Sequence, residues 1–493
     1  MRSKYGSFEG STSHFPGPTS HFLWSLLFVA VFAAAPSAQR PGTLTAAPQI
    51  SRAYDAIFDA RFEQVPALLA QTCPPAPLEV CTLLDVVSRW WQIQIDPENR
   101  SRDSQFLERA DAAIAAVDAW TKREPERAEA WFYLGGAFGA RAQLRVLRGE
   151  TLAAARDGKR IKEALERSLA LDPMLQDAYF GLGLYHYYAG VAPTAAKILR
   201  FLLALPGGDR AAGLEEMLRA RKGGQILKDE ADYQLHLVDL WYEKQPQHAL
   251  TLLRGLRDRH PRNPHFWELI ARVEDVYLHD SRASVRSWNL LLQAAEDGQV
   301  GMRSMAETTA RLALAPHLDA NFETDLALDY VRQVIAANPA APFGALQRAH
   351  QLQRRYQERL EAPTDAARAY RLSLEGWRAY ERGALTEASR LLNQSIALRP
   401  KEMVARYRLA RVLDAQDNDD AAVEMFESVL LSFETTPAAF YASACVEAAR
   451  LYEHRGETAR AVELYRRAVP IYGADPRTKE TAQGALARLG AER

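Results

Sequence analysis

Apolar residues recur at helical spacing from about residue 46 to the carboxyl end of this chain. They return every three or four positions rather than on alternate residues, as expected for helices with one buried face. Single Pro, Gly or Asp-Pro breaks separate these segments about one helix apart. No stretch shows the alternation of a half-buried strand, and the pattern therefore predicts an all-α protein.

Three consecutive carboxy-terminal segments share one helix-turn-helix pattern. Each places a small residue where two helices touch, a tight turn, and then Ala and a large apolar residue on the second helix. The clearest unit runs through Gly376, Gly383, Ala388, Leu392, Ser395, Ile396 and Pro400. The pattern returns roughly every 34 residues and resembles the tetratricopeptide repeat. We therefore predict a right-handed superhelical solenoid of stacked helix pairs.

Weaker matches extend the repeats toward the amino end, with longer inserts. Tyr179, Leu182 and Gly183 open one unit, whose second helix is predicted over residues 211–220. In a central unit Pro316 falls within the first helix, which is expected to stop early or to kink. The predicted regions are an amino-terminal repeat-like region with helical inserts (46–230), central repeats (231–357), carboxy-terminal repeats (366–474) and a capping helix (475–493), with the boundary between halves at residues 358–370.

A short and unusually apolar helix is predicted between Pro193 and Pro206. One interpretation is that it fills the inner face of the superhelix. The other is that its large side chains form an exposed surface for a partner or a membrane interface. These side chains are Ile198, Leu199, Phe201, Leu202, Leu203 and Leu205.

The amino end carries an apolar run at residues 21–35, preceded by Arg2 and Lys4 and followed by small residues. This pattern predicts a signal peptide over residues 1–38 and a periplasmic or secreted protein. A membrane-spanning helix needs about 20 apolar residues, more than this run supplies. An uncleaved membrane anchor is the alternative interpretation.

The charge balance and motif content argue against several functional classes. The 493 residues include 61 Lys plus Arg and 62 Asp plus Glu, a net charge of -1, which disfavours a dedicated nucleic-acid binder. The sequence has no phosphate-binding loop, zinc-protease motif or nucleophile elbow. Its three cysteines lack the spacings of zinc, haem or redox sites. We therefore predict a protein without enzymatic activity, cofactor or metal.

Two of the cysteines bracket a proline-rich turn. Cys73 and Cys81 flank the sequence between two predicted helices, and an oxidising compartment would permit a disulfide there. Closing so small a loop would stabilise the fold by about 2 to 3 kcal/mol on the chain-entropy model. The alternative is two unpaired buried thiols. Cys445 occupies an apolar first-helix position and is interpreted as a buried small hydrophobe.

The first helices of stacked repeats are expected to form a concave wall that binds a protein or peptide partner. Aromatic faces there would cover apolar side chains, and Arg would bind a carboxylate. The alternative is that these residues only pair with one another across adjacent helices, as solvated ion pairs do. The predicted partner-binding residues are Trp377, Tyr380, Tyr407, Arg411, Asp414, Arg450, Glu453 and His454.

The amino-terminal half carries GLGLYHYYAGVAP at residues 181–193 and LPGGDRAAGLEEM at residues 205–217. In these motifs the chain resembles a family of bacterial exported tetratricopeptide proteins over roughly residues 50–275. It is more distantly similar to the eukaryotic family of tetratricopeptide protein 39 and the inclusion-body clearance protein. The resemblance implies an all-helical adaptor without catalytic residues, and a membrane-associated adaptor is the analogous alternative. The third possibility is an enzyme with a dispersed active site.

Overall fold

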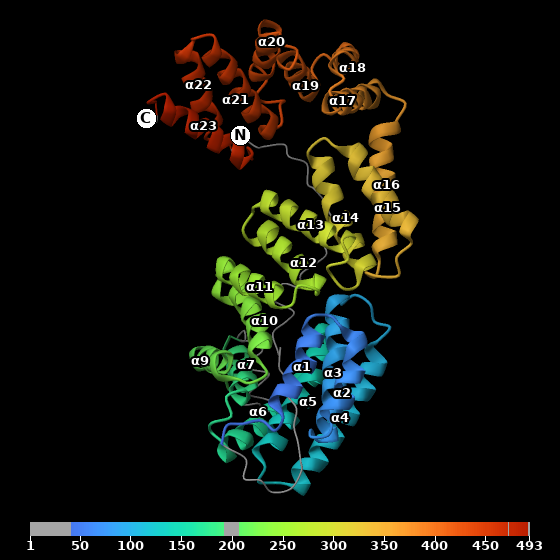
Figure 1. Ribbon diagram of the computed structural model, residues 1–493, viewed down its shortest axis with the longest axis vertical. Helices are drawn as coiled ribbons and strands as arrows, with labels where there is room; N and C mark the ends of the chain where they lie inside the picture. The colour runs from blue at the N-terminus through green and yellow to red at the C-terminus, as the bar shows by residue number, and fades with distance from the viewer. Residues whose placement is uncertain (1–40, 192–206, 472, 492–493) are drawn as a thin grey trace. The chain divides into compact units, whose positions relative to one another are not determined.

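The computed structural model describes residues 41–191, 207–471 and 473–491 (Figure 1). Within these ranges every regular element is a helix and no strand occurs, which confirms the predicted all-α fold of helix-turn-helix pairs. The predicted signal peptide and the apolar helix around Phe201 lie outside the described residues.

The helices form two compact units, each described separately below. Unit 1 holds the described residues up to Ala310 together with Ala340–Phe343, and unit 2 holds the remainder. The elements of unit 1 are α1 (Ala47–Phe58), η1 (Phe62–Gln64), α2 (Val65–Thr72), α3 (Leu78–Ile95), α4 (Asp103–Arg123), α5 (Ala128–Leu147), α6 (Thr151–Leu171), α7 (Ala178–Val191), α9 (Arg210–Gly223), α10 (Lys228–Val238), η2 (Asp239–Glu243), α11 (Pro246–Arg259), α12 (Pro264–Arg272), η3 (Val273–Tyr277) and α13 (Ser281–Glu296).

Helix α14 (Arg303–Ala320) spans the division between the units. It runs through Pro316 and continues for a further turn. The expectation that this helix stops early is therefore wrong, because a proline removes one backbone hydrogen bond while the turns around it stay helical. Unit 2 continues with α15 (Thr324–Ala337), α16 (Ala345–Glu361), α17 (Asp365–Glu381), α18 (Leu385–Leu398), α19 (Met403–Asp414), α20 (Asp419–Leu430), α21 (Ala438–His454), α22 (Thr458–Ala468) and α23 (Pro476–Arg488).

The compact units do not divide at residues 358–370, where the sequence places a boundary between halves. Leu374 of α17 belongs to the same hydrophobic core as α14, α15 and α16. The guanidinium of Arg359 lies over the rings of Phe322 and Tyr370, 5.4 and 4.8 Å from their centroids. Because side chains on both sides of this turn share one core, α16 and α17 belong to one unit.

A recurring hydrogen bond fixes the register of four helix pairs. In each, a side chain near the start of the first helix donates to the carbonyl of the proline six residues before it. The proline ends the preceding turn, so this bond joins successive repeats at the same place. The bonds are Trp131 to Pro125 (2.8 Å), Tyr179 to Pro173 (3.2 Å), Trp267 to Pro261 (3.0 Å) and Arg406 to Pro400 (2.8 Å).

Helices α7 and α9 form one such pair, which confirms the second helix predicted over residues 211–220. The pair crosses at two glycines. A Cβ atom on Gly213 would lie 2.4 Å from the Tyr187 nitrogen and 2.5 Å from the Gly183 carbonyl oxygen. A Cβ on Gly183 would lie 2.7 Å from the Gly213 carbonyl oxygen. The two backbones therefore approach so closely that no side chain fits between them.

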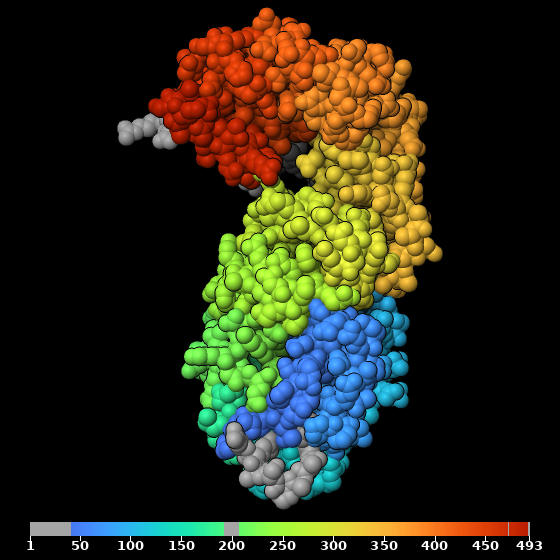
Figure 2. Space-filling view, viewed as in Figure 1, coloured from blue at the N-terminus to red at the C-terminus, as the bar shows by residue number. Residues whose placement is uncertain are grey.

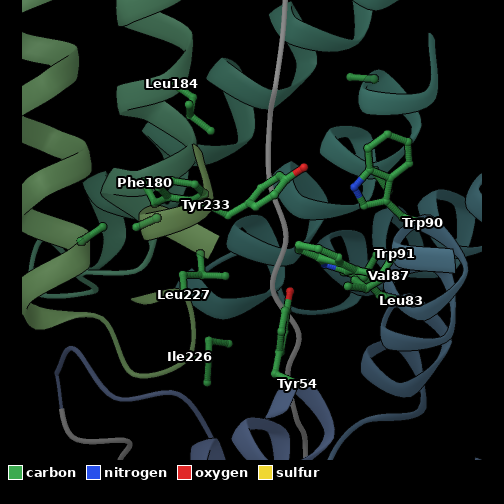
Figure 3. Packing of buried hydrophobic residues seen from close by; sticks show 14 of the residues in the cluster. Tyr54, Leu83, Val87, Trp90, Trp91, Phe180, Leu184, Ile226, Leu227 and Tyr233 are labelled. Atoms are coloured by element: carbon green, nitrogen blue, oxygen red, sulfur yellow. The ribbon is translucent and has the colours of Figure 1, made fainter. Parts of the chain in front are cut away.

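The inner face of unit 1 is filled by its own aromatic side chains (Figure 3). Trp91 of α3 is fully buried, 4.5 Å from Phe58 and 4.9 Å from Tyr233, centroid to centroid. Phe58 ends α1, and its ring also lies 6.4 Å from that of Phe266 on α12. Helix α1 thus joins α3, α10 and α12 in a single core.

The sequence of the first helices explains why this face is covered. Helices α5 and α7 are apolar around most of their circumference, as expected when a helix is buried on every side. The chain around α1 also bonds directly to residues about 200 positions later, where Asn263 donates to the Phe58 carbonyl (2.7 Å) and the Arg262 nitrogen donates to Asp59 (3.0 Å). Figure 2 shows these amino-terminal residues against the later helices of unit 1.

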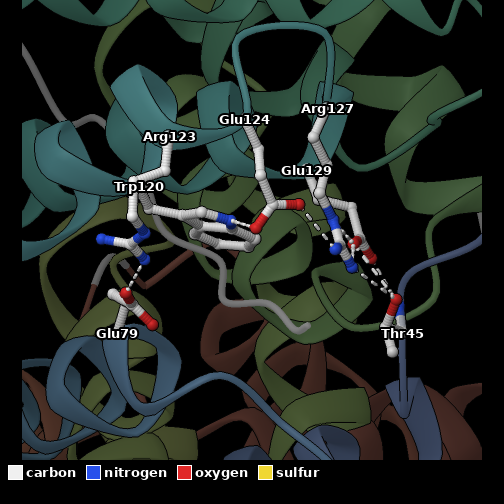
Figure 4. Close-up of polar contacts among 7 residues, drawn as sticks. All are labelled: Thr45, Glu79, Trp120, Arg123, Glu124, Arg127 and Glu129. Atoms are coloured by element: carbon white, nitrogen blue, oxygen red, sulfur yellow. Dashed lines mark hydrogen bonds and ion pairs between the residues drawn. The ribbon is translucent and has the colours of Figure 1, made fainter. Parts of the chain in front are cut away.

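Polar contacts hold the residues before α1 against the turn between α4 and α5 (Figure 4). The Thr45 nitrogen donates to Glu129 Oε1 (2.5 Å) and its hydroxyl donates to Oε2 (3.1 Å). Arg127 pairs with the same carboxylate at 2.8 Å. Burial raises the pKa of Glu129, while the Thr45 and Arg127 donors act against that shift. These bonds fix the entry of α1 into the core.

Candidate functional site

The first helices of the carboxy-terminal repeats in unit 2 carry a partly exposed aromatic pair. Trp377 and Tyr380 are one turn apart on α17, and their rings stack with centroids 4.8 Å apart and planes 21° apart. Both side chains are half-buried. Ala367, Ala369 and Leu374 are among the buried residues of this amphipathic helix. The helix therefore presents a flat aromatic surface beside its buried stripe.

A buried arginine supports this pair from below. Arg408 of α19 is 2 % exposed and lies 5.7 Å from the Trp377 ring centroid. It donates to the Ser373 hydroxyl (3.0 Å) and to the Phe322 carbonyl (2.8 Å). Burial lowers the pKa of Arg408, because the charged form is poorly solvated there. The role of Arg408 could not be predicted from the sequence, since a single Arg among apolar positions does not reveal which ring it lies beneath.

Charged groups on α19 and α21 form a network across adjacent first helices. Arg411 pairs with Glu447 at 3.1 Å, and Arg450 pairs with Asp414 and, at 3.4 Å, with Glu447. These pairings match the alternative in which the predicted residues bind one another. Glu447 links both arginines and was also missed, although its position three residues before Arg450 is a typical helical ion-pair spacing.

The network leaves one donor unused. The buried Nε–H of Arg411 has no hydrogen-bond partner among the described residues. Burial acts against the charged form of Arg411, but Glu447 and Tyr407 outweigh it and raise the pKa of the guanidinium. Tyr380 contributes in the same direction. The guanidinium of Arg411 therefore remains charged.

Tyr407 lies in the core rather than on the open face. It is 8 % exposed, with its ring 6.0 Å from Phe426 and 5.3 Å from Phe440. Burial raises its pKa, and its hydroxyl accepts a 3.4 Å hydrogen bond from Arg411. Its position allows it to orient Arg411 but gives a partner little surface to contact.

The remaining two predicted residues lie at the end of α21 and do not join this network. Glu453 accepts hydrogen bonds from Arg488 of α23 (2.7 Å) and from Tyr465 of α22 (3.1 Å). The Arg488 bonds lower the pKa of Glu453 despite partial burial. His454 is exposed. The structure therefore divides the eight residues. Trp377 and Tyr380 stack on α17, Arg411, Asp414 and Arg450 join one ion-pair network on α19 and α21, and Tyr407 is buried. Glu453 and His454 lie at the end of α21.

Cys73 and Cys81 form a disulfide, with Cα atoms 6.4 Å apart. The bond closes the turn between α2 and α3. Cys445 is a free cysteine, fully buried in the core of unit 2, and burial raises the pKa of its thiol to about 12. A thiol in this state is a poor nucleophile at neutral pH.

Replacing both disulfide cysteines with serine is expected to lower the free energy of unfolding by about 2 to 3 kcal/mol, because the unfolded chain regains the freedom of the closed loop. The midpoint of urea unfolding, followed by circular dichroism, measures this loss. Cys445 is left in place in this experiment, because Cys445→Ser would put a hydroxyl in an apolar core. Addition of reductant should reproduce the loss in the natural protein and leave the double variant unchanged. A reductant effect of equal size in both proteins would contradict the prediction.

The described part of the chain lacks two further kinds of feature. No helix there is both long and apolar enough to cross a membrane. No group of three or more His, Cys, Asp or Glu side chains in those ranges is arranged to hold a metal ion.

Two family models match parts of this sequence, both described as tetratricopeptide repeat. One covers residues 379–444, and the other covers residues 101–144 and 420–476. The open face of α17, α19 and α21 falls largely within the matched carboxy-terminal stretch. No curated protein matches the chain in sequence.

Solved structures with similar helical arrays include three multi-repeat proteins. The TPR2AB domain of yeast Sti1, in its complex with pHSP90, is 12% identical, covers 54% of this chain and 97% of its own, and has a TM-score of 0.23. The P58(IPK) TPR domain is 14% identical over 83% of this chain and 100% of its own, with a TM-score of 0.28. The Cut9–Hcn1 assembly of APC/C is 12% identical over 90% of this chain and 97% of its own, with a TM-score of 0.24.

Such low scores carry no argument about function. The family matches and the helix pairs agree on the repeat type: the chain contains tetratricopeptide repeats, matched at residues 101–144 and 379–476.

Proposed function

We propose that this protein is a non-enzymatic scaffold that binds an extended segment of a protein partner on the first helices of unit 2. The observation that carries the proposal is the half-buried Trp377–Tyr380 stack on α17, together with Arg411 of α19, whose Nε–H has no partner among the described residues. Aromatic rings and arginine are enriched among the residues that contribute most to binding at protein interfaces. Tetratricopeptide repeats typically serve such binding.

The chemistry of this surface indicates what part of a partner it would contact. The stacked rings can cover an apolar side chain with little loss of side-chain freedom. Arg411 and Arg450 already bind Glu447 and Asp414, so a carboxylate of the partner would compete with pairs that are partly exposed and contribute little to stability. Binding would thus exchange weak internal pairs for contacts to the partner.

Capture from a cell extract tests this function. We compare the natural protein with the double variant Trp377→Ala/Arg411→Ala, and identify captured proteins by mass spectrometry. The matched control is Leu152→Ala/Arg156→Ala, which removes an exposed leucine and an exposed arginine from unit 1. We expect the captured amount of specific partners to fall at least tenfold with the first variant and to persist with the control. Equal capture by all three folded proteins would overturn the proposal.

We also propose that the protein is exported. The apolar run at residues 21–35 supports this, and so does the Cys73–Cys81 disulfide, because such bonds persist mainly in oxidising compartments. Fractionation of bacterial cells that express the chain provides the test. A soluble periplasmic form starting near Gln39 is the expected product. Recovery in the membrane fraction with residues 21–35 retained would favour the membrane-anchored adaptor instead.

A further inference from the structure

A cavity of about 640 Å³ opens on the second-helix side of two successive repeats in unit 1. Helices α11 and α13 form its two sides, and α12 with the π-helical segment η3 closes it from behind. Its volume lies within the range of small-ligand and peptide-anchor sites. The cavity belongs to unit 1, whereas the proposed partner surface belongs to unit 2, so the two can be tested separately.

The back wall of this cavity is held in place by a buried carboxylate. Glu274 of η3 is 3 % exposed; it pairs with Arg254 of α11 at 2.9 Å and accepts a 2.6 Å hydrogen bond from the Ser287 hydroxyl of α13. One side chain therefore joins both sides of the cavity. The π-helical segment η3 ends α12, and it places Glu274 between the two second helices.

Four branched apolar side chains form the floor and one edge of the cavity. Leu250 and Ile270 are buried, Leu278 is half-buried, and Leu290 is 52 % exposed. When a second apolar group covers an exposed leucine at the edge of an apolar floor, the apolar area removed from water favours binding. The floor therefore suits a branched apolar side chain.

The charges around the cavity leave an excess of positive groups. Arg286 is exposed and forms no ion pair or hydrogen bond with any described residue. Arg254 holds Glu274 through one nitrogen while half of its side chain stays exposed. Both acidic residues of the lining already have partners. Glu274 binds Arg254 and Ser287. Asp280 caps α13 by accepting a hydrogen bond from the Ala283 nitrogen at 2.8 Å.

The third arginine of the lining, Arg257, pairs with Asp258 at 2.7 Å and lies 5.2 Å from the Trp267 ring centroid. It is therefore held in place, and its charge is balanced by Asp258. Two sides of the cavity present guanidinium groups, which bind carboxylates through paired hydrogen bonds.

We propose that this cavity binds a carboxylate that lies next to a branched apolar side chain on an extended peptide. The apolar side chain occupies the floor at Leu250 and Ile270, and the carboxylate pairs with Arg286 across from Arg254. Such a carboxylate comes either from the free carboxyl end of a peptide or from an internal Asp or Glu beside a Leu. Both sources share one chemistry.

Fluorescence anisotropy with three labelled peptides tests the proposal on the full chain. The first ends in two leucines with a free carboxylate, the second is the same peptide amidated, and the third is amidated with a glutamate beside the two leucines. Saturable binding of the first or third, with the second at least tenfold weaker, is the expected result. The first and third peptides distinguish the two sources of the carboxylate.

Variants at the cavity provide the matched comparison. Arg286→Gln is expected to weaken binding of the charged peptides at least tenfold, because it removes the cation that pairs with the carboxylate. Leu290→Ser should weaken binding severalfold, because it removes apolar surface at the edge of the floor. Both side chains are exposed. Arg156→Gln, an exposed arginine on the second helix α6, should leave binding unchanged. The proposal is overturned if no charged peptide binds, or if Arg156→Gln and Arg286→Gln have equal effects.

Discussion

Trp91→Ala is expected to lower the free energy of unfolding by about 3 to 5 kcal/mol, the range for truncating a buried aromatic residue. Trp91 is fully buried and contacts rings from α1, α10 and α12. Its removal leaves a cavity where residues distant in the chain meet, and those rings cannot all move inward together. Urea unfolding followed by circular dichroism measures the loss.

The conservative variant Trp91→Phe provides the control, because it keeps a ring among Phe58, Tyr233 and Phe266. We expect Trp91→Phe to lose less than half of the free energy of unfolding that Trp91→Ala loses. Hydrogen exchange should place the weakened protection of Trp91→Ala in α1, α3 and α10, with α17 to α23 unchanged. If the two variants unfolded at the same urea concentration as the natural protein, Trp91 would not lie in the core described above.

Gly213→Val should destabilise the protein by about 3 kcal/mol or more, at or above the upper end of the usual effect of overpacking. The added Cβ would meet backbone atoms of Tyr187 and Gly183 at 2.4 and 2.5 Å. Backbone atoms cannot turn away as a flexible side chain can, so α7 and α9 must separate. Thermal unfolding of the purified variant, monitored by circular dichroism, measures the effect.

The same substitution at Gly484 is the matched control for this prediction. Gly484 is an exposed helical glycine of α23, and a Cβ there would meet no atom within 4 Å. Gly484→Val should therefore leave stability nearly unchanged or raise it slightly, because valine is a better helix former than glycine. A similar loss at both positions would attribute the effect to valine in a helix rather than to the contact between α7 and α9.

The two units differ in whether their first helices remain open. In unit 1, α1 and the aromatic side chains around Trp91 fill the inner face. In unit 2, α17 keeps Trp377 and Tyr380 half-buried, and the charged residues of α19 and α21 stay partly exposed. This difference is why the proposed partner surface lies in unit 2, and why the second site proposed for unit 1 lies on its second-helix side.

The candidate site was only partly accessible to sequence reasoning. Offsets within the repeat identify which residues lie on first helices, and five of the eight predicted residues are partly exposed in the aromatic stack of α17 or in the ion-pair network of α19 and α21. The offsets could not reveal that Tyr407 turns into the core toward Phe426, because a tyrosine fits either a buried or an exposed position. They also missed Arg408 and Glu447, whose roles depend on rings and charges of neighbouring helices.

The sequence by itself determined the helices, their pairing and the repeat period, because these depend on contacts between residues within one or two turns or one repeat of each other. It also placed Cys73 and Cys81 at the ends of a single turn. Only the tertiary structure decided which inner face is filled, since Phe58 meets Phe266 across about 200 residues. No local pattern encodes such a contact, because a helix that is apolar on all sides shows that it is buried but not which helix covers it.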